Sequence, residues 1–236
     1  MEKARRSRIE LLMDAAAAPC VCHGAWSAQV AESFRINGID AAELCRDIFT
    51  SLKLGRSERV PVVVLAGARG GEGKSLFLKP LMEVYGHERV FPKPEKGNFP
   101  LVDLPGKRVA FLDEWRFTES IISTATQCVW YDGSVVPINL PQNTPGSSGH
   151  YLYRGSAPIF VTSKLDAIEA LKKLAADDPK TGKPIDADAS MVMRRLKVYV
   201  FSERIPAPPP CIPYCGHCFA TAILNEGAHF GPVSYF

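Results

Sequence analysis

The sequence lacks the features that would place it in a membrane or against a strongly charged partner. No apolar run approaches the roughly 18 residues that a membrane-spanning helix needs. Neither sign of charge is in large excess, because 28 lysines and arginines face 25 aspartates and glutamates, a formal net charge of +3. This balance permits nucleic-acid binding without arguing for it, since binding would need a concentrated basic patch. We therefore expect no membrane contact.

A secretory signal and a disulfide framework are also missing. Glu10 and Asp14 interrupt the apolar part of the N-terminal stretch, which argues against a signal peptide. The seven cysteines are an odd number, and Cys45 and Cys128 fall in segments that we expect to be buried. This usage suits a reducing compartment. We expect a nuclear protein, with the cytoplasm as alternative; the basic cluster at 3–8 is either a nuclear address or a solvated helix end.

What is present is an ordinary globular composition with a regular order of elements. The 236 residues, 46% hydrophobic and 22% charged, suffice for one well-cored α/β domain. Apolar residues recur at helical spacing in three segments, 26–34, 39–52 and 74–86. Short apolar runs predict buried strands at 61–66, 107–112, 157–162 and 196–201. Turn-rich segments predict loops at 141–149 and 177–190.

Strands that alternate with helices indicate an α/β fold with a doubly wound parallel sheet, here of about five strands. The carboxyl ends of parallel strands meet at one edge, where such sheets bind ligands. We divide the chain into a helical segment at 1–56, which could serve oligomerisation, a central α/β domain at 57–205, and a tail rich in proline and cysteine at 206–236.

Residues 68–75 read ARGGEGKS and fit the P-loop pattern, with alanine in place of the usual first glycine. Glycines let the backbone wrap around phosphates so that consecutive N–H groups point inward. In this pattern Lys74 reaches the β- and γ-phosphates of ATP, and the Ser75 hydroxyl ligates Mg²⁺. The predicted nucleotide-binding residues are Ala68, Arg69, Gly70, Gly71, Glu72, Gly73, Lys74, Ser75 and Leu76.

An apolar strand that ends in two acids supplies the other half of this site. Residues 109–114 read VAFLDE, which is what a Walker B element requires. Asp113 would hold Mg²⁺ together with Ser75, and Glu114 would orient or polarise the attacking water.

Polar residues near two later strands are further candidates. Lys164 follows the strand at 157–162, from which it can sense the γ-phosphate if that strand lies between the other two. Arg194 and Arg195 directly precede the last strand. An arginine there could stabilise transition-state charge on the ATP of a neighbouring subunit.

In this order, the segments GEGKS, NFPL, FLDEW, IFVTSK and RRLKVYVF resemble the superfamily 3 helicases of small DNA viruses, above all the parvoviral non-structural replication protein and its relatives in eukaryotic genomes. The resemblance covers residues 40–205. It implies an AAA+-like P-loop fold and a ring, usually a hexamer, that moves along single-stranded DNA with ATP and Mg²⁺. By resemblance, the Walker roles fall to Lys74, Ser75, Asp113 and Glu114, the sensor position to Ser163 and Lys164, and the arginine finger to Arg194 or Arg195.

The chain departs from the family pattern in two places. Lys164 stands where asparagine is usual, and residues 131–140 keep the turn of the family's DNA-contacting hairpin but lack its lysine. Contacts from that hairpin would have to come from Gln142, Asn143, His150 or Arg154. The viral initiators also carry a nuclease with paired histidines, whereas only His23 precedes the P-loop here. We expect nicking to come from a separate nuclease or initiator.

The cysteines of the tail suggest a metal. Cys211, Cys215 and Cys218 are possible zinc ligands, with His217 among them and His229 beyond, and a set at Cys20, Cys22 and His23 could complete the site. Zinc usually takes four ligands from two Cys-x2-Cys pairs, and only Cys215 and Cys218 have that spacing. We favour free thiols over zinc.

The sequence thus predicts an ATPase that acts as a DNA helicase. A nucleotide-dependent assembly ATPase without unwinding is the main alternative, and the missing hairpin lysine favours it. A small P-loop kinase would need an arginine-bearing lid, but residues 177–190 offer only Lys180 and Lys183 as basic groups. A decayed copy of a viral gene is the remaining possibility.

Overall fold

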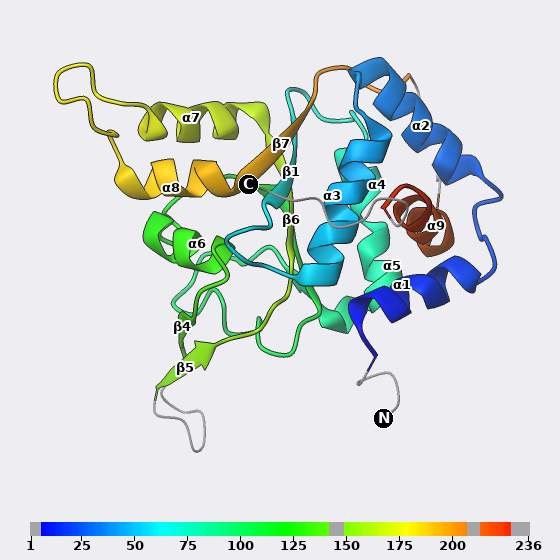
Figure 1. Ribbon diagram of the computed structural model, residues 1–236, viewed down its shortest axis with the longest axis horizontal. Helices are drawn as coiled ribbons and strands as arrows, with labels where there is room; N and C mark the ends of the chain where they lie inside the picture. Colours follow the sequence, from blue (N-terminus) through cyan, green and yellow to red (C-terminus); the bar gives the residue numbers. More distant parts are fainter. Residues whose placement is uncertain (1–5, 142–148, 207–212, 228–236) are drawn as a thin grey trace.

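A five-stranded parallel sheet lies at the centre of the molecule (Figure 1). The structure is a computed structural model that describes residues 6–141, 149–206 and 213–227. The strand order is β2-β3-β6-β1-β7. The strands are β1 (Val62–Gly67), β2 (Val90–Pro92), β3 (Val109–Trp115), β6 (Ile159–Lys164) and β7 (Leu196–Phe201). This arrangement confirms the predicted α/β class with a P-loop NTPase-like sheet.

Helices cover both faces of the sheet, which is why its strands are apolar on both sides. Along β1, Val63 and Leu65 point into one core, and Val62, Val64 and Ala66 point into the other. The first face carries α1 (Arg8–Ala17), α2 (Ala25–Asn37), α3 (Ala41–Leu54), α4 (Lys74–Leu78), α5 (Pro80–Tyr85) and α9 (Gly216–Gly227). The second carries α6 (Thr124–Tyr131), α7 (Leu165–Ala175) and α8 (Ala187–Arg195).

An aromatic cluster joins the N-terminal helices, the P-loop helix and α9. The ring of Trp26 on α2 stacks on Phe77 of α4 at 6.0 Å and meets Phe219 of α9 edge-on at 6.3 Å. Phe34 lies edge-on against Phe77 at 4.9 Å. Buried aromatic rings contribute large apolar areas. The start and the end of the described chain therefore pack against α4 as one layer.

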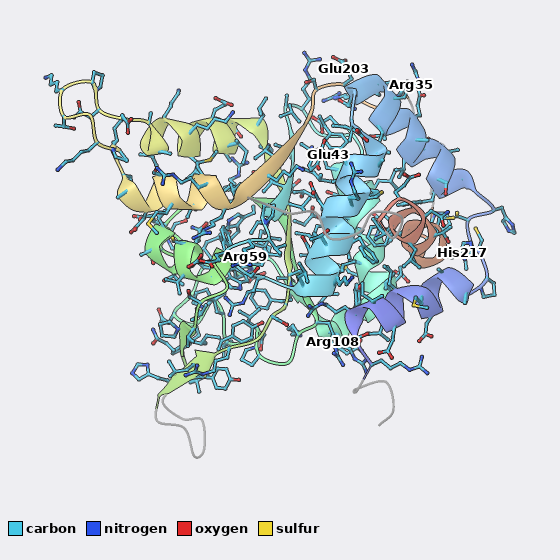
Figure 2. All side chains as sticks on the ribbon, in the orientation of Figure 1. Arg35, Glu43, Arg59, Arg108, Glu203 and His217 are labelled. Carbon is cyan, nitrogen blue, oxygen red and sulfur yellow. The ribbon has the colours of Figure 1, made fainter. Side chains whose placement is uncertain are left out.

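A buried polar group fixes α3 on the edge strand β7. The ammonium of Lys197 lies 2.8 Å from Glu43 Oε1 and 2.6 Å from Asp47 Oδ2, and the Tyr199 hydroxyl also donates to Asp47. Figure 2 shows Glu43 on α3. Asp47 is buried, and a buried polar group is costly unless it has such hydrogen-bond and ion-pair partners. The contact fixes the orientation of α3 on the sheet.

A β-hairpin extends from the second face. It pairs β4 (Val136–Asn139) with β5 (His150–Tyr153) in antiparallel register. Arg56 fixes its base by donating to the carbonyls of Trp130, Ser134 and Gly155 at 2.7 to 2.9 Å. Two of the predicted hairpin contacts, Gln142 and Asn143, lie outside the described residues, as does most of the predicted loop at 141–149.

Several boundaries differ from the sequence-based predictions. The helix predicted over 74–86 is interrupted at Lys79, because Pro80 has no N–H to continue it and starts α5 instead. The predicted loop at 177–190 is too long: Asp186 caps α8 by accepting from the Ala189 N–H at 3.0 Å. The tail contains a helix, α9, that we did not predict. Over the described ranges, no helix combines the length and the apolarity of a membrane span.

We expect Leu65→Ala to lower the free energy of unfolding by about 2–5 kcal/mol, because Leu65 is fully buried in the central strand. Urea titration followed by circular dichroism measures this change. Leu54→Ala is the matched control: this side chain is 58% exposed, so its truncation should change stability by less than about 0.5 kcal/mol. If the two substitutions lowered the free energy of unfolding equally, the burial of β1 on both faces of the sheet would be contradicted.

Candidate functional site

A cleft opens at the carboxyl edge of the sheet, where β1, β3 and β6 end. Its volume is about 360 Å³. Two segments far apart in the sequence form most of its wall: residues 70–76 after β1, and residues 162–164 at the end of β6. Glu114 of β3 also lines it. The parallel direction of the strands brings these residues together, as expected for ligand sites in such sheets.

The loop from Gly67 to Lys74 forms a cradle by virtue of its glycines. Gly70, Gly71 and Gly73 have φ values of 89°, 81° and 98°, which L side chains rarely adopt. A Cβ on Gly73 would also lie 2.6 Å from Ser33 Oγ. Glycine is therefore favoured at all three positions by backbone conformation, and at Gly73 also by close packing against α2.

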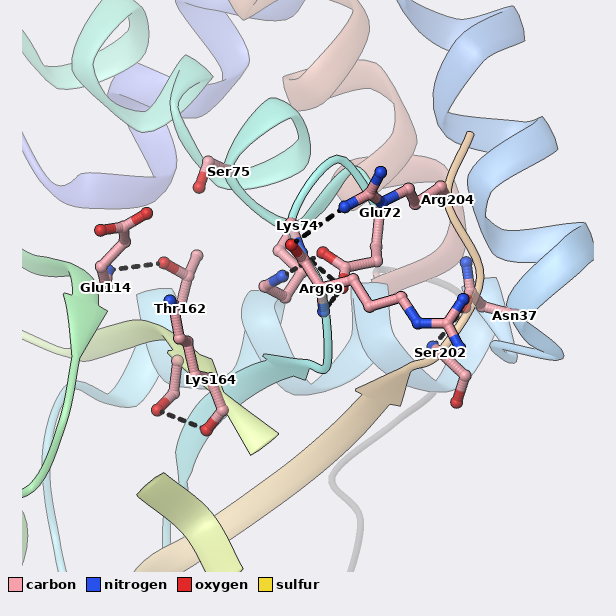
Figure 3. Close-up of polar contacts among 12 residues, drawn as sticks. Asn37, Arg69, Glu72, Lys74, Ser75, Glu114, Thr162, Lys164, Ser202 and Arg204 are labelled. Carbon is pink, nitrogen blue, oxygen red and sulfur yellow. Dashed lines mark hydrogen bonds and ion pairs between the residues drawn. The ribbon is translucent and has the colours of Figure 1, made fainter. Parts of the chain in front are cut away.

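The side chain of Glu72 fills this cradle (Figure 3). Its Oε1 accepts from the N–H groups of Arg69 and Gly70 at 2.5 and 2.8 Å, and its Oε2 lies 2.6 Å from Lys74 Nζ. Burial by itself raises the pKa of Glu72, but the Lys74 ammonium and these N–H donors outweigh it and hold the pKa at about 2. The loop and Lys74 thus form a binding site for an anionic oxygen, and the chain's own carboxylate takes that position.

Segments outside the P-loop hold its backbone in place. Ser33 Oγ on α2 donates to the Glu72 carbonyl at 2.7 Å, and the Ile205 N–H donates to the Gly71 carbonyl at 3.1 Å. Asn37 in turn accepts from the N–H groups of residues 202 and 203 at 2.7 and 2.8 Å, which fixes the strand exit that carries Ile205. The helix α2 and the segment after β7 therefore support the cradle from both sides.

The predicted magnesium ligands meet directly. Ser75 Oγ donates to Asp113 Oδ1 at 2.8 Å, and Thr162 Oγ1 donates to the same oxygen at 2.6 Å. The ammonium of Lys79 lies 3.8 Å from Asp113 Oδ2. A hydroxyl and a carboxylate side by side are hard oxygen donors of the kind that Mg²⁺ prefers. The residues present therefore fit this ion.

Glu114 occupies a strained position at the lip of the cleft. Its φ of 53° is left-handed, which is uncommon for a residue with a side chain, and it lies in an irregularity of the β3–β6 ladder. Its N–H donates to Thr162 Oγ1 at 2.9 Å, while its carboxylate is exposed to the cleft. The bulge turns this carboxylate away from the sheet and toward the ligand position.

The strand β6 lies between β1 and β3, as the sensor hypothesis requires. Lys164 is exposed and lines the cleft, so its ammonium is available to an anionic ligand. Ser163 is buried and donates to the Trp115 carbonyl at 2.6 Å, which binds β6 to the end of β3. Of the two predicted sensor residues, Lys164 therefore faces the ligand position and Ser163 supports it.

Arg194 and Arg195 lie at the opposite edge of the sheet from the cleft. They end α8 just before Leu196, which pairs with Val62 at the start of β1. Arg195 is engaged within the chain, since it contacts Asp132 at 2.5 Å and donates to the Glu58 carbonyl at 2.9 Å. Neither arginine can reach the cleft of this chain.

The predicted nucleotide-binding residues divide into two groups. Gly70 to Leu76 line the cleft, whereas Ala68 and Arg69 are exposed in the loop that leads to it. The prediction missed Gly67, which lines the cleft at the end of β1. It also missed four residues in or beside the cleft from other segments: Lys79, Thr162, Ile205 and Tyr214. Thr162 follows the apolar run of its strand and could have been found as a polar strand end. The other three carry no pattern that separates them from ordinary helix and tail residues.

The cysteines of the tail meet cysteines of the N-terminal segment. Cys215 and Cys218 gather with Cys20 and Cys22, whereas Cys211 lies outside the described residues. Hydrogen bonds from the N–H groups of Gly24 and Cys22 lower the pKa of the Cys20 thiol to about 6.

The chain matches no protein-family model and no curated protein. Its fold is similar to solved apo structures of the NrS-1 C-terminal region. The A form spanning 305–718 has a TM-score of 0.48 and 12% identity, covering 86% of this chain and 42% of that chain. A second A-form structure has a TM-score of 0.49 and 11% identity, covering 84% of this chain and 44% of that chain. This chain therefore spans less than half of either NrS-1 chain.

We expect Glu72→Gln to tighten the binding of pyrophosphate and of Mg-ATP. A neutral amide competes less well for the N–H groups and the ammonium, because hydrogen bonds to charged groups are roughly twice as strong as neutral ones, so affinity should rise about tenfold. Isothermal titration calorimetry measures the dissociation constants.

Glu169→Gln, an exposed carboxylate on α7, is the matched control and should leave both constants unchanged. Weaker binding in Glu72→Gln would mean that the Glu72 carboxylate shapes the loop instead of competing for its anion position.

Proposed function

We propose that the protein hydrolyses ATP with Mg²⁺ and couples this reaction to movement along single-stranded DNA, as a superfamily 3-type helicase domain. The observation that carries the ATPase part is the cradle: two backbone N–H groups and an ammonium hold the two oxygens of a carboxylate beside a hydroxyl–carboxylate pair. Phosphoryl transfer to water needs these groups plus a base that orients the water. Glu114 supplies that base from the strained end of β3.

Each residue has a definite task in this chemistry. Lys74 exchanges its partner, Glu72, for the β- and γ-phosphates, since a phosphate carries more charge than a carboxylate. Ser75 and Asp113 would hold Mg²⁺, which supplies positive charge against the transferring phosphoryl group. Glu114 accepts a hydrogen bond from the attacking water and aligns it with the γ-phosphorus. Lys164 adds a charge from β6 to the developing negative oxygens.

The DNA part of the proposal draws on the ordered resemblance to superfamily 3 and on the β4–β5 hairpin. The strand β5 presents His150, Tyr151 and Leu152 to solvent, and Arg154 follows it. Tyr151 is 43% exposed. Exposed aromatic and basic groups on one ribbon are suited to stacking on bases and to pairing with phosphates of a single strand. Arg154 and His150 take the place of the absent hairpin lysine.

A homo-oligomeric ring accounts for the position of the arginines. Since Arg194 is exposed at the edge of the sheet opposite the cleft, it can act only on the nucleotide of a neighbouring copy. Head-to-tail contacts between such opposite edges close into rings when the rotation permits.

One observation favours an assembly ATPase instead. Residues 131–140, all of which the structure describes, contain no lysine, and Arg195 is already paired with Asp132. Such a protein would use ATP to change its oligomeric state and would not respond to DNA.

Steady-state ATP hydrolysis with and without single-stranded DNA separates these proposals. We expect hydrolysis to rise with DNA and to vanish in Lys74→Ala, which loses the ammonium of the cradle. A Lys74-dependent rate that is indifferent to DNA would support the assembly ATPase. Absence of hydrolysis by the wild-type chain, with and without DNA, would contradict the ATPase proposal and favour a decayed gene copy.

We expect Glu114→Gln to bind Mg-ATP with wild-type affinity but to lower kcat by about 10²–10⁴-fold, because the amide cannot act as a base. Calorimetry and a phosphate-release assay measure the two quantities on the same protein. Glu169→Gln again serves as control and should keep the wild-type kcat. Equal losses of binding and of kcat in Glu114→Gln would assign Glu114 to nucleotide binding instead of to water activation.

A further inference from the structure

Four cysteine sulfurs meet where the first and last helices of the described chain come together. Cys20 and Cys22 lie in the turn between α1 and α2, and Cys215 and Cys218 lie at the start of α9. The four Sγ atoms all lie within 4.8 Å of one another. Figure 2 marks this end of α9 by His217, which lies between Cys215 and Cys218 in the sequence.

The spacing of the sulfurs is that of a tetrahedral metal site. Cys218 Sγ lies 3.5 Å from both Cys20 Sγ and Cys22 Sγ, Cys20 Sγ lies 3.6 Å from Cys22 Sγ, and Cys20 Sγ lies 3.9 Å from Cys215 Sγ. With zinc–sulfur bonds of about 2.3 Å, the edges of an S₄ tetrahedron are about 3.8 Å long. A disulfide would require about 2.05 Å between two sulfurs. One ion at the centre therefore fits all four.

The surroundings of the sulfurs suit thiolate ligands. Cys22, Cys215 and Cys218 are buried and Cys20 is partly buried, so bulk water does not compete for the centre.

The segment that carries Cys20 and Cys22 ends in a tight turn. His23 has a φ of 50° and Gly24 a φ of 85°, two consecutive left-handed residues directly after Cys22. These two residues turn the chain between Cys22 and the start of α2 at Ala25.

We propose that Cys20, Cys22, Cys215 and Cys218 bind one structural zinc ion. An all-sulfur tetrahedral set selects zinc or iron among the common metals. Iron–sulfur clusters place several irons and sulfides between their cysteines, which this close spacing leaves no room for, so the site takes one ion; elemental analysis distinguishes zinc from a single iron. With four protein ligands the site is closed, so it serves folding and not catalysis. Binding converts the thiols to thiolates and releases their protons to solvent.

The ion would join Cys20 to Cys215 and Cys218, which lie 195 and 198 residues further along the chain. α9 packs against α1, α3 and α5 beneath this site. Tyr214, the neighbour of Cys215, lines the cleft, and Lys79 lies 5.6 Å from its ring. The zinc site therefore fixes the residues that close one side of the cleft, but it does not depend on the proposed ATPase function.

The test begins with the full wild-type chain, produced in zinc-supplemented medium. Elemental analysis should find about one zinc per chain, and removing it with a chelator should lower Tm by at least about 5 °C. Exchange of the zinc for Co²⁺ should give the visible absorption bands and the sulfur-to-metal charge-transfer band of a four-thiolate site. These measurements need no variant and decide the proposal even if a cysteine variant fails to fold.

Variants then identify the ligands. Cys20→Ser and Cys215→Ser should lose zinc, whereas Cys20→His, at the one partly exposed position, should retain the metal and shift the cobalt bands. Cys128→Ala is the matched control, since this thiol is buried in α6 away from the four, and it should keep a full zinc content. A wild-type chain that holds iron, forms disulfides among these cysteines, or takes up neither zinc nor cobalt would overturn the proposal. Equal zinc loss in Cys128→Ala would overturn the ligand assignment.

Discussion

Parallel pairing of β1 with β6 and β7, and of β6 with β3, is the constraint from which the candidate site follows. Parallel strands require crossovers over the faces of the sheet, so both faces are covered and the strands must be apolar throughout. The chain can then present polar groups only where the strands end. The carboxyl ends of the parallel strands meet at one edge of the sheet. There Ser75 and Thr162 both reach Asp113, although they lie 38 and 49 residues from it in the sequence.

The P-loop depends on support from outside its own motif. Its glycines permit the curved backbone, but Ser33 from α2 and Ile205 after β7 hold two of its carbonyls. The N-terminal helices thus have a direct part in the shape of the cradle. The Glu72 carboxylate forms an ion pair with the Lys74 ammonium, so the positive charge of Lys74 is already balanced before any ligand binds. A ligand must offer more negative charge than a single carboxylate to replace it, which suits a polyphosphate.

The layer formed by α1 to α5 and α9 contributes to both proposed metal sites, the Mg²⁺ site beside the cradle and the zinc site at the four cysteines. Trp26, Phe77 and Phe219 join α2, α4 and α9 in its core, and the four cysteines close it at one end. Since α4 begins at Lys74, the position of the cradle depends on the same packing. Stabilising the contact between the first and last helices therefore stabilises the nucleotide site as well.

The sequence alone was sufficient for the class of fold and for the central motifs. Apolar runs of strand length, separated by helical segments, located four of the five strands of the parallel sheet. The fifth, β2, has only three residues, which is too short a pattern to detect. The P-loop glycines and the acid pair could be predicted because local backbone conformation and strand ends dictate those residue types. Only the tertiary structure decided which distant groups meet. Glu72 occupies the cradle through partners only two or three residues away, but the P-loop pattern assigns those groups to phosphate and so does not predict a carboxylate there. That Tyr214 lines the cleft, and that Cys20 and Cys22 join Cys215 and Cys218, depends on contacts between segments far apart in the chain, for which local periodicity and spacing carry no signal.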